Sequence, residues 1–481
     1  MADSEQRSAW LRNEVQAVLG RNVESIRWDT LGFNNHLAFV TLVPSSTDSG
    51  SNDTVPRPAT DEIVVRIPKD KSSNVDPRGK LENEVAALQI ARAHGIPCPQ
   101  VIRYNSDPLY VIQDRLPGTP VKEVWHLMTD GERANLCASL ANVMKNLRSI
   151  SLPGSASSES GYGGFRLGDR EPGSGTPGDF VVLGTNPLGF KEPTSSLTGH
   201  LRAFFDWQMD LARANPFLSG WAYKSVAATG LEDGQADPSN TTGSTQQSLA
   251  DRLQAFSSDP DRGLDFVLQK LEKDSGEIGQ AVFVHGDFDL HNVLLDQETY
   301  KVTGLVDFEF ARAAPAWEEH FDGLAGVGHG HSGPEDDNVD VVRHGQALLH
   351  PAGWSSDSNP IPRTEQVGKV TSLSGDDPQD VVTWDVVHAW DRACEGEGVL
   401  TPRKMNTKQA GEKEGVFALA SRLHWFISDV CPWQLEDAKA ELGSTGKDTL
   451  DHLPDERREW VVRKREKAAQ RLDRFLAFWN F

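Results

Sequence analysis

The chain begins with a helical pattern of apolar positions. Residues 8–19 are followed by Gly20, a residue type that often ends helices, so this stretch predicts a short amphipathic helix. Its apolar positions are Trp10, Leu11, Val15, Val18 and Leu19.

The next apolar runs predict strands. Residues 37–43 and 63–67 are short and rich in β-branched or aromatic side chains. A Ser/Asp/Gly/Pro-rich stretch at about 44–60 separates them. We therefore expect a strand hairpin interrupted by a polar insert.

One prominent helix is predicted at about 80–94. Its apolar positions share one face, and Gly95 and Pro97 prevent it from continuing. Residues 101–102 and 109–112 predict two more strands. The first ~118 residues thus form an α/β pattern dominated by strands.

Beyond this point the pattern becomes mainly helical. Gly/Ser/Pro-rich stretches at about 151–198 and 224–250, and an acidic segment at about 326–382, predict loops or disordered inserts. Residues 281–284 and 302–306 are short apolar runs, each followed by an acidic motif. Helical periodicity is found at 130–149, 200–214, 262–273, 416–430 and 455–481.

Composition narrows the class of protein. The 481 residues are 38% hydrophobic and 25% charged, which indicates two domains, or one large two-lobed domain, with polar insertions. The net charge of −22 repels phosphate backbones and anionic lipid, and no run approaches ~18 apolar residues. We therefore expect neither nucleic acid nor a membrane as a partner. Four widely separated cysteines and an N-terminus without an apolar core favour a cytoplasmic location, while the oligomeric state is not indicated.

Two acidic motifs carry the chemical signal. Residues 284–295 read Val-His-Gly-Asp-Phe-Asp-Leu-His-Asn-Val-Leu-Leu, with Asp287 five positions before Asn292. Asp307 begins an Asp-Phe-Glu motif directly after the next apolar run. Phosphoryl transfer requires an acid that orients a nucleophilic hydroxyl and oxygen ligands for a metal ion. Asp287 fits the first role, and Asn292 and Asp307 fit the second.

The His-Gly-Asp-x-x-x-x-Asn and Asp-Phe-Glu motifs resemble those of the aminoglycoside phosphotransferase family. This family is a branch of the protein-kinase-like fold that also includes choline, homoserine and methylthioribose kinases. The resemblance implies ATP and Mg²⁺ as cofactors, Asp287 as the catalytic aspartate, and Asn292 and Asp307 as metal ligands. It also implies a small-molecule hydroxyl acceptor, whose identity the sequence does not indicate.

The N-terminal region supports the same resemblance. Residues 31–40, with Gly32 and Asn35, resemble the family's turn over the ATP phosphates. Residues Gln113 and Arg115 belong to a segment that resembles the hinge between lobes, where backbone groups bind adenine. Both segments are expected to bind the nucleotide.

A cation and an acid complete this resemblance. Arg66 lies where kinases keep the lysine that pairs with phosphate, and a guanidinium can hold phosphate oxygens with two hydrogen bonds. Glu84 occupies the place of the helix glutamate that pairs with this cation. One departure is Arg148, since the family usually ends this helix in Leu-His.

Other residues near the motifs have less specific expectations. His285 is expected to support the loop rather than to catalyse. Glu309 fits equally a second acid near the metal or a helix-start residue. Asp289 and His291 are expected to face solvent or the loop.

Three further features favour structure over chemistry. The Gly328-His329-Gly330-His331 run lies in an acidic segment and is expected to be solvent-exposed rather than to bind a metal. Trp425, Trp460 and Trp479 lie on apolar faces of predicted helices, where core packing explains them. Asp322 is expected to be structural.

We therefore predict an α+β, protein-kinase-like, two-lobed fold. A small N-terminal α/β lobe at 20–115 would bind the nucleotide, and a mainly helical lobe at 116–481 would hold the catalytic and substrate residues. The predicted function is ATP-dependent transfer of the γ-phosphate to a small-molecule hydroxyl. The alternatives are a catalytically silent nucleotide-binding protein of the same fold, a protein kinase, and a scaffold that acts through its inserts. A protein kinase is disfavoured because the chain lacks GxGxxG and Asp-Phe-Gly.

Overall fold

The computed structural model of the chain contains two compact units. The first comprises Met1–Pro193, Ala281–Gly328 and Thr383–Val399, and the second comprises Thr194–Gln280, His329–Val382 and Leu400–Phe481. This division does not test the lobe boundary predicted between residues 115 and 116, which stays a prediction. The structure describes residues 2–29, 35–44, 60–69, 76–153, 161–168, 181–189, 192–218, 248–349, 384–408, 412, 414–443 and 453–481.

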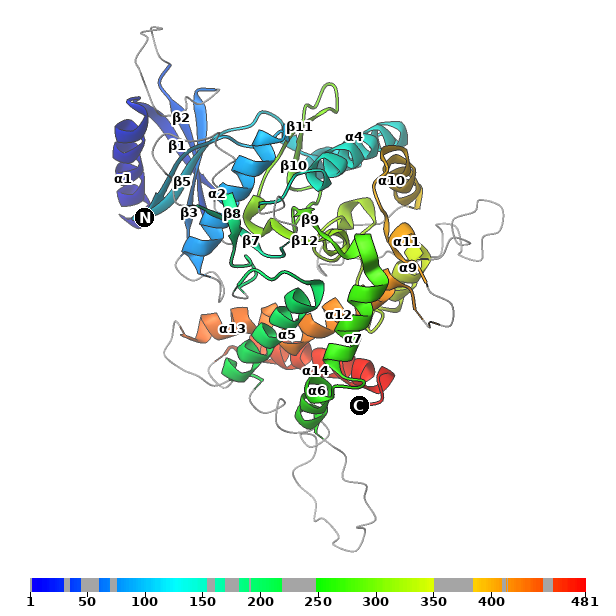
Figure 1. Cartoon of the computed structure of the whole chain (residues 1–481). Coiled ribbons are helices and arrows are strands. Elements are labelled where there is room, and N and C mark those ends of the chain that lie inside the picture. Colours follow the sequence, from blue (N-terminus) through cyan, green and yellow to red (C-terminus); the bar gives the residue numbers. More distant parts are fainter. Residues whose placement is uncertain are drawn as a thin grey trace, which may run out of the picture. The chain divides into compact units, whose positions relative to one another are not determined.

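The N-terminal part of the first unit is built on a five-stranded antiparallel sheet (Figure 1). The strand order is β1-β2-β3-β5-β4. The predicted strands are confirmed, and β1 is an additional strand that the sequence analysis missed. The bounds are β1 Val23–Asp29, β2 Asn35–Leu42, β3 Glu62–Pro68, β4 Val101–Ser106 and β5 Leu109–Asp114.

Two helices pack on this part of the unit. Helix α1 (Ala2–Leu19) begins earlier than predicted, and it buries Leu11 and Val15 against apolar side chains of the sheet. Helix α2 (Pro77–Ala93) starts where the Asp76 carboxylate accepts hydrogen bonds from the next turn, and it ends before Gly95 as predicted. The polar insert at 44–60 lies almost entirely outside the described residues.

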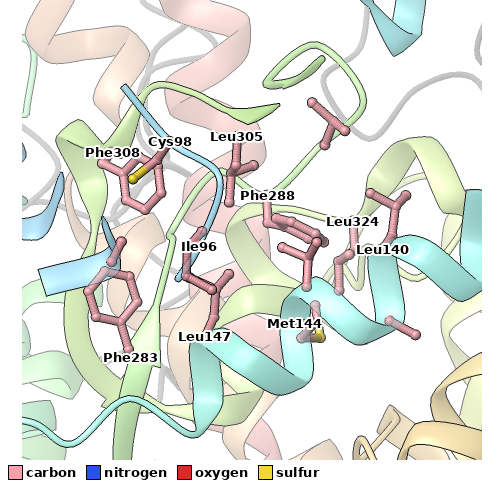
Figure 2. Packing of buried hydrophobic residues seen from close by; sticks show 14 of the residues in the cluster. Ile96, Cys98, Leu140, Met144, Leu147, Phe283, Phe288, Leu305, Phe308 and Leu324 are labelled. Carbon is pink, nitrogen blue, oxygen red and sulfur yellow. The ribbon is translucent and has the colours of Figure 1, made fainter. Parts of the chain in front are cut away.

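The two sequence motifs lie between short strands in the same unit. Strands β9 (Ala281–Val284) and β12 (Arg312–Pro315) pair with each other, and β10 (Val293–Leu295) pairs with both β11 (Val302–Leu305) and β6 (Thr119–Pro120). Helix α4 (Asp130–Arg148) packs beneath them. Figure 2 shows Leu140 and Met144 of α4 close to Phe288 and Leu324 in one buried cluster. Burial of Phe288 anchors the loop that carries Asp287.

The stretch at 151–198, predicted as a loop, contains a hairpin. Strands β7 (Gly164–Leu167) and β8 (Val181–Gly184) pair with each other, so that part of the prediction is wrong. The hairpin is tied to the rest of the unit by reciprocal backbone hydrogen bonds of 3.0 and 2.8 Å between Gly163 and Ala313. Its stability depends on a partner distant in sequence, which local composition does not reveal.

The second unit is helical. The helices predicted at 200–214, 262–273, 416–430 and 455–481 are confirmed with small shifts of their ends, and aromatic rings join them. The rings of Phe426 and Phe475, for example, stack with centroids 3.8 Å apart. The bounds are α5 Leu197–Ala214, α6 Leu249–Ser258, α7 Leu264–Ser275, α9 Val339–Leu349, α11 Pro402–Met405, α12 Val416–Val430, α13 Trp433–Gly443 and α14 Asp455–Phe478.

The structure describes only part of the inserts predicted at about 224–250 and 326–382. Helix α9 lies within the acidic segment 326–382, so the prediction of a loop there is wrong over 339–349. The remainder from 350 onwards, and nearly all of 224–250, lies outside the described residues. Helix α10 (Trp384–Glu397), which follows this segment, packs on α4 in the first unit.

The histidines at 329 and 331 are buried, so the prediction that they are solvent-exposed is wrong. Their exposed fractions are 1% and 4%. The Nδ1 atom of His331 lies 2.8 Å from the Ser421 hydroxyl, and the Trp425 indole donates to the His331 carbonyl at 2.9 Å. These two partners of His331 belong to α12, about 90 residues along the chain.

We expect His331 to make the fold sensitive to acid. Burial, reinforced by His344, lowers the pKa of His331 to about 3. Because this pKa is lowered on folding, the stabilisation is complete above pH ~6.5 and is lost as pH falls towards 3, by up to ~1.4 kcal/mol per unit. Between pH 7 and 5 the wild type should lose ~2 kcal/mol more unfolding free energy than His331→Gln in urea denaturation.

The matched control is His126→Gln, because His126 is exposed. It should follow the wild type at both pH values. An identical pH dependence in His331→Gln and the wild type would contradict the assignment.

The four cysteines are all buried and form no disulfide. Burial raises the pKa of the Cys98 and Cys137 thiols to about 12, and it also raises that of Cys431. Such thiols remain protonated and shielded at neutral pH. Among the described residues, no helix combines the length and hydropathy needed to cross a bilayer.

Candidate active site

The loop between β9 and β10 holds Asp287 in a fixed orientation. Its Oδ2 atom accepts a hydrogen bond from Asn292 Nδ2 at 2.8 Å and lies 3.3 Å from His291 Nε2. The same Asn292 nitrogen also donates to the Asp287 carbonyl at 2.9 Å. Burial raises the pKa of Asp287, while His291 opposes this rise. The loop therefore presents a positioned carboxylate with increased basicity.

His285 supports this loop from below, as the sequence analysis expected. Its ring is fully buried, with Nε2 3.1 Å from the Val306 carbonyl and Nδ1 accepting the Asp287 N–H at 3.3 Å. This arrangement requires the proton on Nε2, which is the neutral form. Burial lowers the pKa of His285 to about 4, consistent with that form.

Glu319 is a loop-positioning residue that the sequence analysis missed. Its buried carboxylate accepts backbone N–H groups of His285 at 2.8 Å, Gly286 at 3.0 Å and Phe288 at 3.3 Å. Burial raises the pKa of Glu319, while these donors and the neighbouring arginines Arg312 and Arg148 oppose the rise. One carboxylate thus holds three backbone N–H groups on both sides of Asp287.

Gly286 can be only glycine in this loop. Its φ is +78°, and a Cβ atom would lie 2.4 Å from the Phe310 carbonyl oxygen and 2.5 Å from Arg312 Nη1. We expect Gly286→Ala to lower the unfolding free energy by about 2–4 kcal/mol, measured by urea denaturation. Gly131→Ala is the matched control, because no atom lies within 4 Å of its Cβ position. A loss in Gly286→Ala no larger than in the control would contradict this account.

Arg66 forms ion pairs with three carboxylates from two parts of the chain. From β3 it reaches Glu84 of α2 at 3.0 Å, Asp307 at 2.8 Å and Glu309 at 3.5 Å. Burial alone would lower the pKa of Arg66, but these carboxylates raise it, so the guanidinium stays charged. Burial raises the pKa of Glu84, and Arg66 opposes that rise. The structure thus brings together the cation and the acid that the sequence paired.

A second buried cation, Lys80, was not predicted. Its ammonium lies 3.1 Å from Glu309 Oε1 and 4.3 Å from the centre of the Phe310 ring. Lys80 precedes Glu84 by one helical turn, so the two side chains share a face of α2, a signal present in the sequence. Asn35 Nδ2 also donates to Glu309 at 3.1 Å. Glu309 is therefore a buried acid of the site, and it also lies in the first turn of the short 3-10 helix Phe308–Phe310.

Asp307 adopts a strained backbone conformation. Its φ of +67° is uncommon for a residue with a side chain. Burial would raise the pKa of Asp307, but Arg66, with smaller contributions from His285 and Lys80, opposes this, and the pKa is lowered. The Asp307 side chain is 32% exposed, so the ionised carboxylate remains accessible to a ligand.

The sequence matches the phosphotransferase enzyme family, with the matched region covering residues 48–341, more than half of the chain. The chain belongs to this family. The resemblance seen in the motifs at 285–309, and with it the predicted kinase-like α+β fold, is confirmed. No curated protein sequence matches the chain.

Several solved phosphotransferase structures are similar to this family member. The macrolide 2′-phosphotransferase from Brachybacterium faecium is 13% identical with a TM-score of 0.39, covering 96% of this chain and 97% of that one. The gentamicin complex of APH(2″)-IIa is 11% identical with a TM-score of 0.42, covering 96% and 98%. An ethanolamine kinase from Plasmodium vivax is 11% identical with a TM-score of 0.37, covering 92% and 82%. Their substrates are properties of those proteins.

The structure of this phosphotransferase does not connect three of the residues predicted to bind the nucleotide with Arg66 and its carboxylate partners. Arg115 pairs with the exposed Glu62 at 2.8 Å. Gln113 is buried in β5, and its Oε1 atom has no hydrogen-bond partner among the described residues. Gly32 lies outside the described residues. The nucleotide-binding role of these three residues stays a prediction.

The donor chemistry of the phosphotransferase site fits a hard cation. Asp307 offers carboxylate oxygens and Asn292 an amide oxygen, which are ligand types that Mg²⁺ prefers. Among the described residues, no group of three or more His, Cys, Asp or Glu side chains forms a ready metal cage.

The remaining loop residues have structural partners. The Asp289 carboxylate accepts the backbone N–H groups of Leu290 and Gly326, both at 2.8 Å, and so faces the loop as expected. Asp322 pairs with the fully buried Arg312 at 2.5 Å, in agreement with its expected structural role. Arg148, the departure from the family pattern, donates to the Ala316 carbonyl at 3.3 Å.

Proposed function

We propose that the chain is an ATP-dependent small-molecule kinase, which transfers the γ-phosphate to a hydroxyl of the acceptor. The observation that carries this proposal is the position of Asp287 between two fixed groups. Asn292 holds one carboxylate oxygen at 2.8 Å, and Glu319 holds the loop backbone. Family membership supports phosphoryl transfer as the reaction class.

In this proposal Asp287 acts on the acceptor hydroxyl. Its carboxylate orients the hydroxyl and accepts its proton as the oxygen–phosphorus bond forms. The raised pKa of Asp287 improves its capacity as a base, and the Asn292 hydrogen bond restricts its rotation. Asp287 is thus the proposed catalytic residue.

The cofactors are assigned to the residues that match their chemistry. Asn292 and Asp307 would hold Mg²⁺, which neutralises phosphate charge when bound. Arg66, kept in place by Glu84, would pair with phosphate oxygens, and Asn35 and Gly32 would lie near them. Gln113 and Arg115 are proposed to line the adenine side. The buried Nε atom of Arg66 has no hydrogen-bond partner among the described residues, which supports a role in binding an added anion.

The organisation of the proposed enzyme follows the same assignment. Nucleotide binding is placed in the lobe at 20–115, and catalysis and acceptor binding in the lobe at 116–481. We propose a cytoplasmic location and a small-molecule acceptor rather than nucleic acid, since the net charge is −22.

A catalytically silent nucleotide-binding protein is the second candidate. One observation favours it. Arg66 forms an ion pair with Asp307 at 2.8 Å and so competes with a metal ion for this carboxylate. The kinase proposal requires Mg²⁺ and nucleotide to separate this pair, whereas the silent protein could keep it.

The deciding experiment measures phosphate transfer from ATP to a panel of hydroxylated small molecules, with and without Mg²⁺. The panel should include aminoglycosides, macrolides, amino alcohols, sugars and hydroxy amino acids. Mg²⁺-dependent phosphorylation of one acceptor class would support the kinase proposal. Tight Mg·ATP binding without transfer to any acceptor would favour the silent protein.

A further inference from the structure

The second unit contains a cavity of about 500 Å³, and none of its lining residues has a role in the proposed phosphotransfer so far. It is lined by the segment 333–341, the end of α12, the start of α13 and the middle of α14. This volume is in the range of small-molecule sites. All of its lining residues belong to the second unit.

Two tryptophans line the cavity. Trp433, at the start of α13, is 64% exposed, which is unusual for the largest apolar side chain. Trp425 of α12 is fixed by its hydrogen bond to the His331 carbonyl at 2.9 Å. The backbone of Gly333 lies against the Trp425 ring, since a Cβ on Gly333 would lie 3.1 Å from Trp425 Cγ and 3.2 Å from Trp425 Cδ1. The cavity thus has one fixed aromatic wall and one exposed ring.

The polar walls are held by internal ion pairs. Arg471 binds both carboxylate oxygens of Asp429 at 2.7 and 2.5 Å. Arg474 lies 2.6 Å from Asp337, and Glu335 pairs with Arg422. These contacts fix the carboxylates before any ligand arrives, which reduces the entropic cost of binding.

The same ion pairs indicate which net charge the cavity favours in a ligand. Three of the four lining carboxylates already have arginine partners, and Asp336 is the fourth. Lys464 and Lys467 also line the cavity. An organic cation would meet these lysines and Arg471, and an anion would meet the carboxylates. A neutral ligand with many hydrogen-bonding groups avoids both penalties.

We propose that this cavity binds a neutral polyhydroxylated ring of the hexopyranoside type. The slightly positive C–H edges of such a ring pack against the negative faces of Trp433 and Trp425. Its hydroxyl groups donate to Asp336 and accept from Lys467. None of the cavity's lining residues belongs to the loop that carries Asp287.

The test is saturation-transfer NMR on the full chain, supported by calorimetry. The probes are the methyl glycosides of glucose, galactose, mannose and xylose, with choline chloride and inorganic phosphate as charged comparators. NMR is chosen because 13 tryptophans would mask one ring in bulk fluorescence. We expect transfer to the ring protons of at least one glycoside and a Kd in the millimolar range, roughly −4 kcal/mol.

Variants locate the binding. Trp433→Ala should weaken the glycoside at least ~10-fold, and Lys467→Ala several-fold, because both side chains line the cavity and are exposed enough to be replaced without unfolding. The matched control is Phe266→Ala, which removes another exposed aromatic ring of this unit, 43% exposed and outside the cavity. It should bind like the wild type.

Three results would overturn the proposal. The first is the absence of saturation transfer to any glycoside at a concentration of about 50 mM, which is ~50-fold above a millimolar Kd. The second is glycoside binding that Trp433→Ala leaves unchanged. The third is tighter, Trp433-dependent binding of choline or phosphate, which would assign the cavity to a charged ligand. Since no ATP is present, none of these results depends on whether the chain transfers phosphate.

Discussion

Asp287→Asn is expected to reduce phosphate transfer by about 10²–10⁴-fold while leaving nucleotide affinity nearly unchanged. The amide keeps the size of the side chain but cannot accept the proton of the acceptor hydroxyl. The hydrogen bond from Asn292 Nδ2 loses its carboxylate partner, so the orientation of the loop end also weakens. Steady-state kinetics gives the loss, and calorimetry with a nonhydrolysable ATP analogue gives the affinity.

The matched control for this change is Glu123→Gln, an exposed carboxylate-to-amide substitution in the same unit. It should retain full activity. If Asp287→Asn turned over like this control, Asp287 would not be the base and the catalytic assignment would fail. If both variants and the wild type bound nucleotide without transfer, the silent protein would be favoured.

Arg66→Met is expected to lower the unfolding free energy by about 3–5 kcal/mol. The substitution leaves Glu84 and Glu309, whose side chains are only 2% and 6% exposed, without their shared cation. Asp307 loses its ion pair as well. Urea denaturation at pH 7 measures the effect, and nucleotide affinity should fall in the same variant.

A double-mutant cycle separates the contribution of the Arg66–Glu84 ion pair to the unfolding free energy from the other effects of the two substitutions. Glu84→Met together with Arg66→Met should cost less than the sum of the single changes, because the pair is removed as a unit. The matched control is Arg115→Met, since Arg115 also forms an arginine–glutamate pair, with Glu62 at 2.8 Å, but an exposed one. Its expected cost is below about 1 kcal/mol. Equal losses in Arg66→Met and Arg115→Met would contradict the buried cluster.

Much of the fold follows from local sequence. Helix α2 ends where Gly95 and Pro97 predict, and the apolar runs before the two motifs are strands. Strand β1 was missed because its sequence, Val-Glu-Ser-Ile-Arg-Trp-Asp, is polar and half exposed, and pairing with β2 decides its structure. The β7–β8 hairpin was missed for a similar reason, since Ala313 holds it from outside.

The site residues were predictable where the spacing within a sequence motif indicated their chemical role. The two motifs that follow predicted strands identified Asp287, Asn292 and Asp307. The family resemblance identified Arg66 and Glu84 as a pair. Glu319 has no local signal, since its role comes from three backbone N–H groups more than 30 residues away. The burial of His331 likewise depends on Ser421 and Trp425, which only the folded chain brings near.

The buried thiols provide an internal reporter of opening. Because Cys98, Cys137 and Cys394 belong to the first unit and Cys431 to the second, a thiol-reactive dye would label each unit only when that unit opens. Labelling rates resolved by peptide mass would therefore give the opening equilibrium of each unit separately, in one sample and without an engineered probe. Ligands could then be assigned to a unit by the cysteine that they protect.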